Sequence, residues 1–283
     1  MQYPTISEYV KASQDAGDNL DMSTKATAEE LNEAVIDEFG VKYSKDGRKL
    51  LKAPQNLDGT YSIKEGVRII CDNAFEGRTS LSSLVIPDSV TSIGVGAFQF
   101  CSSLNDIIIP DSVTSIGIYA FGECTSLSSL VISDSVTSIG NWAFYYCDAL
   151  RSVVIPDGVT SIGVGAFIGC KSLSNVVIPD SVTSIGDGAF EDCSSLSSVV
   201  LPDSITSIGN RAFNECDTLR SVVIPDGVTS IGVGAFIGCK SLKSLEIPDS
   251  VTSIGFGAFS YCYFPYKLKQ ELISRFGDKI FGN

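Results

Sequence analysis

Apolar residues recur along this chain with a fixed period of 23 positions. One full row, residues 81–103, reads LSSLVIPDSVTSIGVGAFQFCSS, and residues 151–173 and 220–242, three periods apart, are identical to each other. Self-similarity at a fixed period indicates an array of stacked structural units, and the identical rows indicate a recent duplication. The clearest marker of the period is an Ala-Phe pair, whose phenylalanines are Phe75, Phe98, Phe121, Phe144, Phe167, Phe190, Phe213, Phe236 and Phe259.

Each row predicts a short strand followed by a turn and a bend. Val153 and Ile155 alternate with period 2, which is typical of a strand. Pro156 ends the strand because it has no N–H to donate to a neighbouring strand. Gly163 then permits a tight bend, and Phe167 fills the interior. One such coil is too thin to bury its own apolar side, so the coils must stack.

Stacked strands about 4.8 Å apart predict one parallel sheet along one wall of a solenoid. A parallel β-helix has coils of similar length, but the half-row Ala-Phe-x-x-Cys-x-x-Leu lacks the alternation of a strand. At these residues the chain closely resembles the BspA-type leucine-rich repeats, whose pattern LxxVxIPxxVxxIGxxAFxxCxxL matches about residues 63–262. The resemblance implies a leucine-rich-repeat solenoid of right-handed 23-residue coils. It also implies a binding or adhesion role, often at a bacterial or protozoan surface, and brings no catalytic residues.

The pattern divides the chain into an N-terminal capping region of helices and a hairpin (1–58), an array of about nine coils (59–262) and a C-terminal capping helix (263–283). Caps are expected at both ends because the first and last coils of an array otherwise expose their apolar faces. The C-terminal helix is predicted from an apolar stripe of Leu268, Leu272 and Phe276, closed by Gly277.

The N-terminal region carries two capping-box patterns, at residues 5–8 (TISE) and 27–30 (TAEE). The second predicts a helix that ends at Gly40. Asp-Gly at 46–47, between two apolar residues, predicts a hairpin turn between Tyr43 and Leu50. The predicted helix presents one apolar face, made of Leu31, Val35 and Phe39.

Composition narrows the function further. The chain has a formal net charge of −13 and no histidine. Without histidine there is no Ser-His or Cys-His dyad and no His-containing metal site. An acidic chain also lacks the basic face that nucleic acids and anionic membranes require. We therefore expect a non-enzyme without cofactor or metal.

Nothing in the sequence predicts a membrane segment or a leader. No run of about 18 apolar residues exists to cross a bilayer. The N-terminus shows no basic region followed by an apolar run, so no signal peptide is recognisable. The expectation is that the protein stays inside the cell, unless a leader has been removed, in which case it acts at the cell surface or outside.

Cysteine forms one column of the repeat. In the first coil Arg78 takes the cysteine position. Inward side chains of adjacent coils are best interpreted as buried small hydrophobes, although neighbouring Cα atoms lie within disulfide range and a metal site is a further alternative. Reduced thiols fit a reducing compartment slightly better than a secreted protein. The column consists of Cys101, Cys124, Cys147, Cys170, Cys193, Cys216, Cys239 and Cys262.

Aspartate forms a second column at the turn after each strand. At coil spacing, neighbouring carboxylates repel by about 0.9 kcal/mol per pair in water. We expect turn N–H groups to offset this repulsion by donating to the carboxylates, with a calcium-binding edge as the alternative. These residues, named the Asp row below, are Asp88, Asp111, Asp134, Asp157, Asp180, Asp203, Asp226 and Asp249.

The outward strand position is apolar instead of polar. It holds Val85, Ile108, Val131, Val154, Val177, Val200 and Val223, followed by Glu246. An exposed apolar strip about 30 Å long indicates an interface for a partner or a weak homodimer. The alternative is that β-branched residues simply favour strands. Val131, Val154 and Val177 are the candidate contacts.

Aromatic residues flank the Ala-Phe pair in the early coils, where other coils carry mostly small or polar residues. We expect these variable positions to lie at the surface and to form a binding hot spot, with partial burial as the alternative. Trp142 occupies a position that is glycine in five other coils, which favours a contact role. The candidates are Phe100, Tyr119, Trp142, Tyr145 and Tyr146.

Two functions remain open. The first is a non-catalytic module that presents its repeat surface to a protein or glycan, with adhesion as one outcome. The second is a structural or self-associating scaffold without a dedicated ligand. Both follow from the repeat array, which by itself identifies no ligand.

Overall fold

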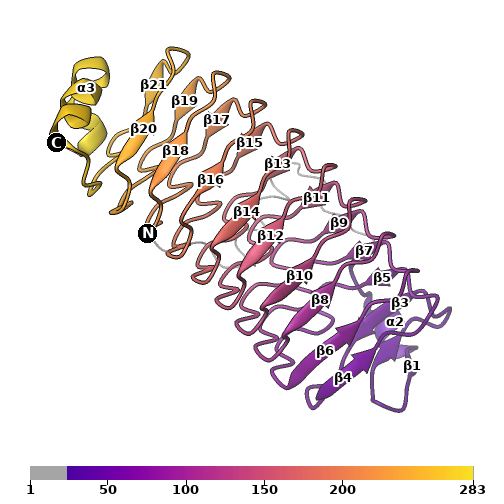
Figure 1. Cartoon of the computed structure of the whole chain (residues 1–283). Coiled ribbons are helices and arrows are strands. Elements are labelled where there is room, and N and C mark those ends of the chain that lie inside the picture. The colour runs from indigo at the N-terminus through magenta and orange to yellow at the C-terminus, as the bar shows by residue number, and fades with distance from the viewer. Residues whose placement is uncertain (1–23, 283) are drawn as a thin grey trace.

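The computed structural model describes residues 24–282 as an elongated β-solenoid with a 23-residue coil (Figure 1). Each coil contributes a longer strand and, after the Pro-Asp turn, a two-residue strand. The longer strands form the first wall: β4 (Gly59–Ser62), β6 (Leu81–Val85), β8 (Asp106–Ile108), β10 (Ser129–Val131), β12 (Ser152–Val154), β14 (Asn175–Val177), β16 (Val199–Val200), β18 (Ser221–Val223) and β20 (Ser244–Glu246).

The short strands form a second wall, which the sequence pattern did not predict. From residue 92 onward each consists of Ser-Ile with the isoleucine buried. Most pair in parallel with the same residues of the next coil, as Ser184 does with Ser207, but the pairing lapses between Ser138–Ile139 and Ser161–Ile162. Two residues are too few to show the alternation that predicts a strand. The strands of this wall are β3 (Lys49–Lys52), β5 (Ile69–Ile70), β7 (Ser92–Ile93), β9 (Ser115–Ile116), β11 (Ser138–Ile139), β13 (Ser161–Ile162), β15 (Ser184–Ile185), β17 (Ser207–Ile208), β19 (Ser230–Ile231) and β21 (Ser253–Ile254).

The nine Ala-Phe phenylalanines form the centre of the core. Each is fully buried, and successive rings stack with centroids 5.0–5.6 Å apart and interplanar angles of 4–19°. Offset stacking of this kind is favourable beyond the area it buries. The repeat therefore determines one continuous hydrophobic column rather than separate cores in each coil.

The glycine after each short strand is required by the approach of the next coil. Gly163 does not have a positive φ, so it does not serve the tight bend that we expected. An added Cβ at Gly163 would lie 2.7 Å from Oδ1 of Asn141, and one at Gly186 would lie 2.8 Å from the carbonyl carbon of Gly163. Both distances are shorter than van der Waals contact, so the coils stack this closely because glycine is present.

The N-terminal end differs from its prediction. The capping box at 27–30 is confirmed, because Glu30 N–H donates to the Thr27 hydroxyl at 3.1 Å. However, helix α2 (Ala28–Asn32) ends eight residues before Gly40, and β1 (Val35–Ile36) follows. Residues 37–41 form a turn in which Asp37 Oδ1 accepts from the N–H groups of Phe39 and Val41. Residues 5–8 lie outside the described part of the chain.

The hairpin and the C-terminal helix are confirmed. β1 pairs antiparallel with β2 (Lys42–Tyr43), and β2 pairs with β3 through Tyr43 and Leu50. At the other end α3 (Tyr266–Phe276) stops at Gly277. The 3₁₀ helix η2 (Asp278–Phe281) then replaces a further coil, because Ile280 accepts the Phe259 N–H at 2.8 Å. Within the described residues, no helix is long and apolar enough to cross a membrane.

Candidate partner-binding face

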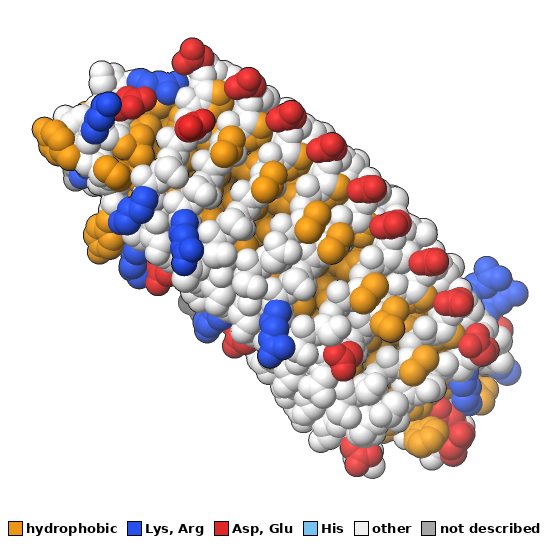
Figure 2. Space-filling view, in the orientation of Figure 1, with side chains coloured by type: hydrophobic (Ala, Val, Ile, Leu, Met, Phe, Trp, Pro, Cys, Tyr) orange, Lys and Arg blue, Asp and Glu red, His pale blue; other side chains and the backbone are white. Residues whose placement is uncertain are grey.

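Seven consecutive coils place one β-branched side chain on the outer surface of the first wall (Figure 2). These side chains are 47% to 80% exposed, which confirms the predicted outward orientation. The wall consists of three hydrogen-bonded sheets, and the side chains are aligned within each of them: Val131 pairs with Ile108, Val154 with Val177, and Val200 with Val223. We name them the Val/Ile strip: Val85, Ile108, Val131, Val154, Val177, Val200 and Val223.

Side chains along each strand alternate between the core and the surface, and this alternation keeps the strip exposed. Val153 and Ile155, on either side of Val154, are each 1% exposed and belong to the core. Turning one residue inward would turn its neighbours outward, because side chains of a strand alternate between faces. The strip is therefore a rigid surface whose position is set by the core behind it.

The Asp row borders the strip along one edge. All eight carboxylates are exposed, and acidic side chains follow that edge of the face in Figure 2. The expectation that turn N–H groups donate to these carboxylates is wrong. Among the described residues no backbone N–H donates to this row, and each turn closes through its own backbone, as Val159 N–H does to Pro156 O at 3.0 Å. The carboxylates therefore point to solvent because the turn does not need them.

Water and salt reduce the mutual repulsion of this exposed row. Two of its members have side-chain partners: Asp111 accepts from Ser133 Oγ at 2.7 Å, and Asp249 from Arg275 at 3.4 Å. Within the described residues no three potential metal-binding side chains gather into one group, so calcium binding at this edge has no structural support.

The opposite flank of the strip carries positive charge from the middle of the array onward. Arg151, Arg220 and Lys243 occupy the position after the repeat leucine, and all three are exposed. In the early coils the flank instead holds serine and asparagine, together with Asp106. The face is thus apolar along its middle, acidic along one edge, and neutral to basic along the other.

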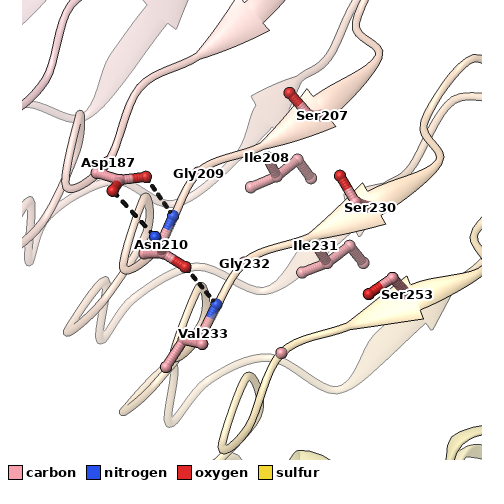
Figure 3. Close-up of a pocket in the computed structure, with 11 residues that line it drawn as sticks. Asp187, Ser207, Ile208, Gly209, Asn210, Ser230, Ile231, Gly232, Val233 and Ser253 are labelled. Carbon is pink, nitrogen blue, oxygen red and sulfur yellow. Dashed lines mark hydrogen bonds between the residues drawn. The ribbon is translucent and has the colours of Figure 1, made fainter.

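A hollow on the second wall is lined by polar groups that already bind one another (Figure 3). Asp187 accepts from the Asn210 N–H at 2.7 Å and from its side-chain amide at 3.0 Å. Asn210 in turn accepts from the Val233 N–H at 2.8 Å. These bonds connect successive coils, so the side chains serve the stacking of the array and leave the first wall as the stronger candidate surface.

Two of the five candidate aromatic residues are core residues, which corrects the prediction of a surface hot spot. Trp142 is 2% exposed and Tyr119 is 4% exposed, and their rings stack at 5.2 Å. Tyr145 and Tyr146 are partly buried beside them, and Phe100 is 39% exposed without joining this group. The four clustered rings form a second hydrophobic cluster, away from the strip and its three candidate valines.

The backbone explains why sequence reasoning misplaced Trp142. Its φ is 54°, and the equivalent Gly165 has a φ of 61°. Glycine recurs at this position because the left-handed conformation favours it, so its recurrence does not mark the position as a surface one. An added Cβ on Gly165 would overlap the Trp142 ring, so the ring lies across the glycine of the next coil. Tyr119 has the same left-handed backbone and stacks on Trp142 of the next coil, so large side chains at this position pack between coils.

The cysteines are free thiols in the interior. From Cys101 to Cys239 the column is 0% exposed, and each Sγ donates to the phenylalanine carbonyl 26 residues earlier, as Cys147 does to Phe121 O at 3.2 Å. Burial raises the pKa of the Cys101 thiol to about 12. In the first coil the buried guanidinium of Arg78 donates to the carbonyl of Ala53 instead. The column thus connects successive coils.

The comparisons with known proteins agree with this architecture. Residues 59–174 and 137–265 match the BspA-type leucine-rich repeat region, in six copies. A leucine-rich cell surface protein of Faecalibacterium prausnitzii is 33% identical, with a TM-score of 0.65, over 81% of this chain and 74% of that protein. A leucine-rich-repeat protein of Eubacterium ventriosum is 29% identical, with a TM-score of 0.60, over 65% of this chain and 50% of that protein. No curated protein matches the sequence.

Proposed function

Because the chain belongs to the BspA-type leucine-rich repeat family, we propose that it is a non-catalytic module that binds a protein through the Val/Ile strip. The observation that carries the proposal is the exposure of seven aligned β-branched side chains on one rigid wall. Contiguous apolar surface of this kind on a folded protein usually marks an interaction site. The cell surface is the proposed location, by analogy with the similar protein of F. prausnitzii.

Strand propensity alone does not account for the strip. β4 carries Ser62 at the outward position and still pairs with β6 through Val85. β20 carries Glu246 there and pairs with β18 through Val223. Since the wall forms at both ends without an apolar outward residue, the seven intervening β-branched side chains serve something other than strand formation.

A protein fits this surface better than a glycan or a second copy. The strip is aliphatic, whereas sugar rings are typically held by aromatic faces and converging polar groups. Self-association brings together two chains that each carry a net charge of −13, which opposes it. The buried thiols are compatible with an extracellular location, because solvent oxidants do not reach fully buried Sγ atoms.

The test compares two triple variants of the immobilised protein. Val131→Thr/Val154→Thr/Val177→Thr keeps the β-branch but adds hydroxyls to the strip. Ser138→Ala/Ser161→Ala/Ser184→Ala changes the second wall to the same extent and serves as the control. Proteins retained from a cell-surface extract should be lost on the threonine variant and kept on the alanine variant, with melting curves showing that both fold.

Equal retention by the two variants would place binding on another surface and contradict the proposal. Sedimentation equilibrium decides the scaffold alternative. A dimer that forms with the parent chain and disappears in the threonine variant would show that the strip serves self-association instead of partner recognition.

A further inference from the structure

We infer that the partner element is a cationic amphipathic α-helix of about 20 residues, which lies along the Val/Ile strip with its basic side chains over the Asp row. This inference rests on the proposed function and specifies its partner. It follows from the dimensions of the strip, the charge of its edges and the contact between successive strands along the wall.

The dimensions of the strip suit a helix. Seven side chains about 4.8 Å apart span about 29 Å, the length of a helix of roughly 19 residues. The helix pitch of about 5.4 Å exceeds the coil spacing by about 0.6 Å per turn, which accumulates to only about 3 Å over five turns. The apolar stripe of the helix therefore runs along the whole strip, and its register drifts by less than one coil spacing.

The charge of the edge determines the chemistry of the helix. Asp157 follows Val154 by three positions, so the Asp row lies at most about 10 Å from the strip. A helix with its side chains is about 10–12 Å wide, so lysine or arginine on its flank reaches these carboxylates. The Asp row is exposed and its turns do not use it, so its carboxylates, apart from the partnered Asp111 and Asp249, are available to a basic partner.

The opposite flank limits where the positive charge of the helix lies. Arg151 and Arg220 are exposed there, so basic residues on that side of a bound helix are repelled. The partner helix consequently carries its lysines and arginines on one flank, with neutral or acidic residues on the other. This arrangement also determines the direction in which the helix lies along the array.

An extended peptide fits less well. Hydrogen-bonded pairing lapses between β10 and β12 and between β14 and β16, but these strands still lie in contact, so no gap opens inside the wall for an added strand. A strand laid across the face presents side chains on one side about 6.8 Å apart, which does not match rows at about 4.8 Å.

The probe is a synthetic 20-residue peptide, capped at both ends, with a leucine stripe at i, i+3, i+4 and i+7 spacing and lysines on one flank. A peptide of the same composition in scrambled order controls for charge alone. Binding is measured by calorimetry at low and at moderate salt. The Asp134→Asn/Asp157→Asn/Asp180→Asn variant removes three carboxylates beside the strip, and Glu29→Gln/Glu38→Gln/Glu271→Gln removes three exposed ones from the two ends.

The amphipathic peptide should bind the parent chain at least tenfold more tightly than the scrambled peptide. The Asp variant should weaken binding about tenfold, as expected for losing three exposed ion pairs, and the Glu variant should change it less than twofold. Higher salt should weaken binding to the parent chain more than to the Asp variant.

Equal binding of the two peptides, or an Asp variant that binds like the Glu variant, would overturn the inference. Absence of binding would overturn it as well. The proposed function has a separate readout, since loss of retained surface proteins in the threonine variant supports it even when the helical peptide fails. If the threonine variant retains the same surface proteins as the parent chain, the proposed function itself is contradicted.

Discussion

Raising the pH from 7.5 to 9.5 should strongly destabilise this protein, because its interior holds a column of neutral thiols. We consider the seven thiols from Cys101 to Cys239, each 0% exposed. Burial raises the pKa of six of them above that of a free thiol, and contact with Cys262 together with burial does so for Cys239. Unfolding exposes all seven to water.

The magnitude follows from the difference between the two states. A free thiol has a pKa of about 8.5, so at pH 9.5 the unfolded chain holds about ten thiolates for each thiol. The folded chain keeps each thiol protonated. Ionisation of the thiols in the unfolded chain alone therefore stabilises the unfolded state by about 1.4 kcal/mol per thiol, or about 10 kcal/mol for seven. Because the folded pKa is raised, the full stability is present below about pH 8.5 and is lost as the pH rises. The loss rivals the whole stability of an ordinary domain, about 5–15 kcal/mol.

The assay is urea unfolding at pH 7.5, 8.5 and 9.5, with a phosphine reductant throughout so that no disulfide forms. The Cys147→Ala/Cys170→Ala/Cys193→Ala variant separates thiols from tyrosine and lysine, which titrate near pH 10. It should start less stable but lose about 4 kcal/mol less than the parent chain by pH 9.5. A parent midpoint that does not move, or a variant with the same pH dependence, would refute the reasoning.

Two substitutions test the packing of the rings. Phe167→Ala should cost about 3–5 kcal/mol, since its buried ring stacks on Phe144 at 5.3 Å and on Phe190 at 5.5 Å; a loss below about 1 kcal/mol in equilibrium denaturation would contradict this position in the core. Trp142→Ala should lower the stability by about 3 kcal/mol, because its buried ring stacks on Tyr119 and covers Gly165; a melting temperature equal to that of the parent chain would return the ring to the surface role that the sequence suggested.

Much of the fold follows from the one-dimensional pattern. The 23-residue period, the inward Ala-Phe pair and the outward Val154 require only that each coil bury its apolar side against the next. The same reasoning failed at 35–39, where helical spacing of apolar residues predicted a helix and the chain forms β1 and a turn. There Asp37 supplies the local hydrogen bonds of the turn, and pairing with β2 stabilises the strand. Propensity within a short segment did not decide between these outcomes.

The sequence by itself determined the coil, its core and the exposed strip, because strand alternation and the need for burial act within one row. Only the tertiary structure decided what neighbouring coils do to one another. Gly163 lies where two backbones approach closely, and Trp142 folds over Gly165 because that residue has no side chain. These contacts join residues of adjacent coils, and the left-handed φ at Trp142 is marked in the sequence only by the glycines that recur at this position, which do not indicate whether a side chain there is buried. The burial of a side chain that depends on the neighbouring coil, such as that of Trp142, can therefore be determined only from the stacked structure.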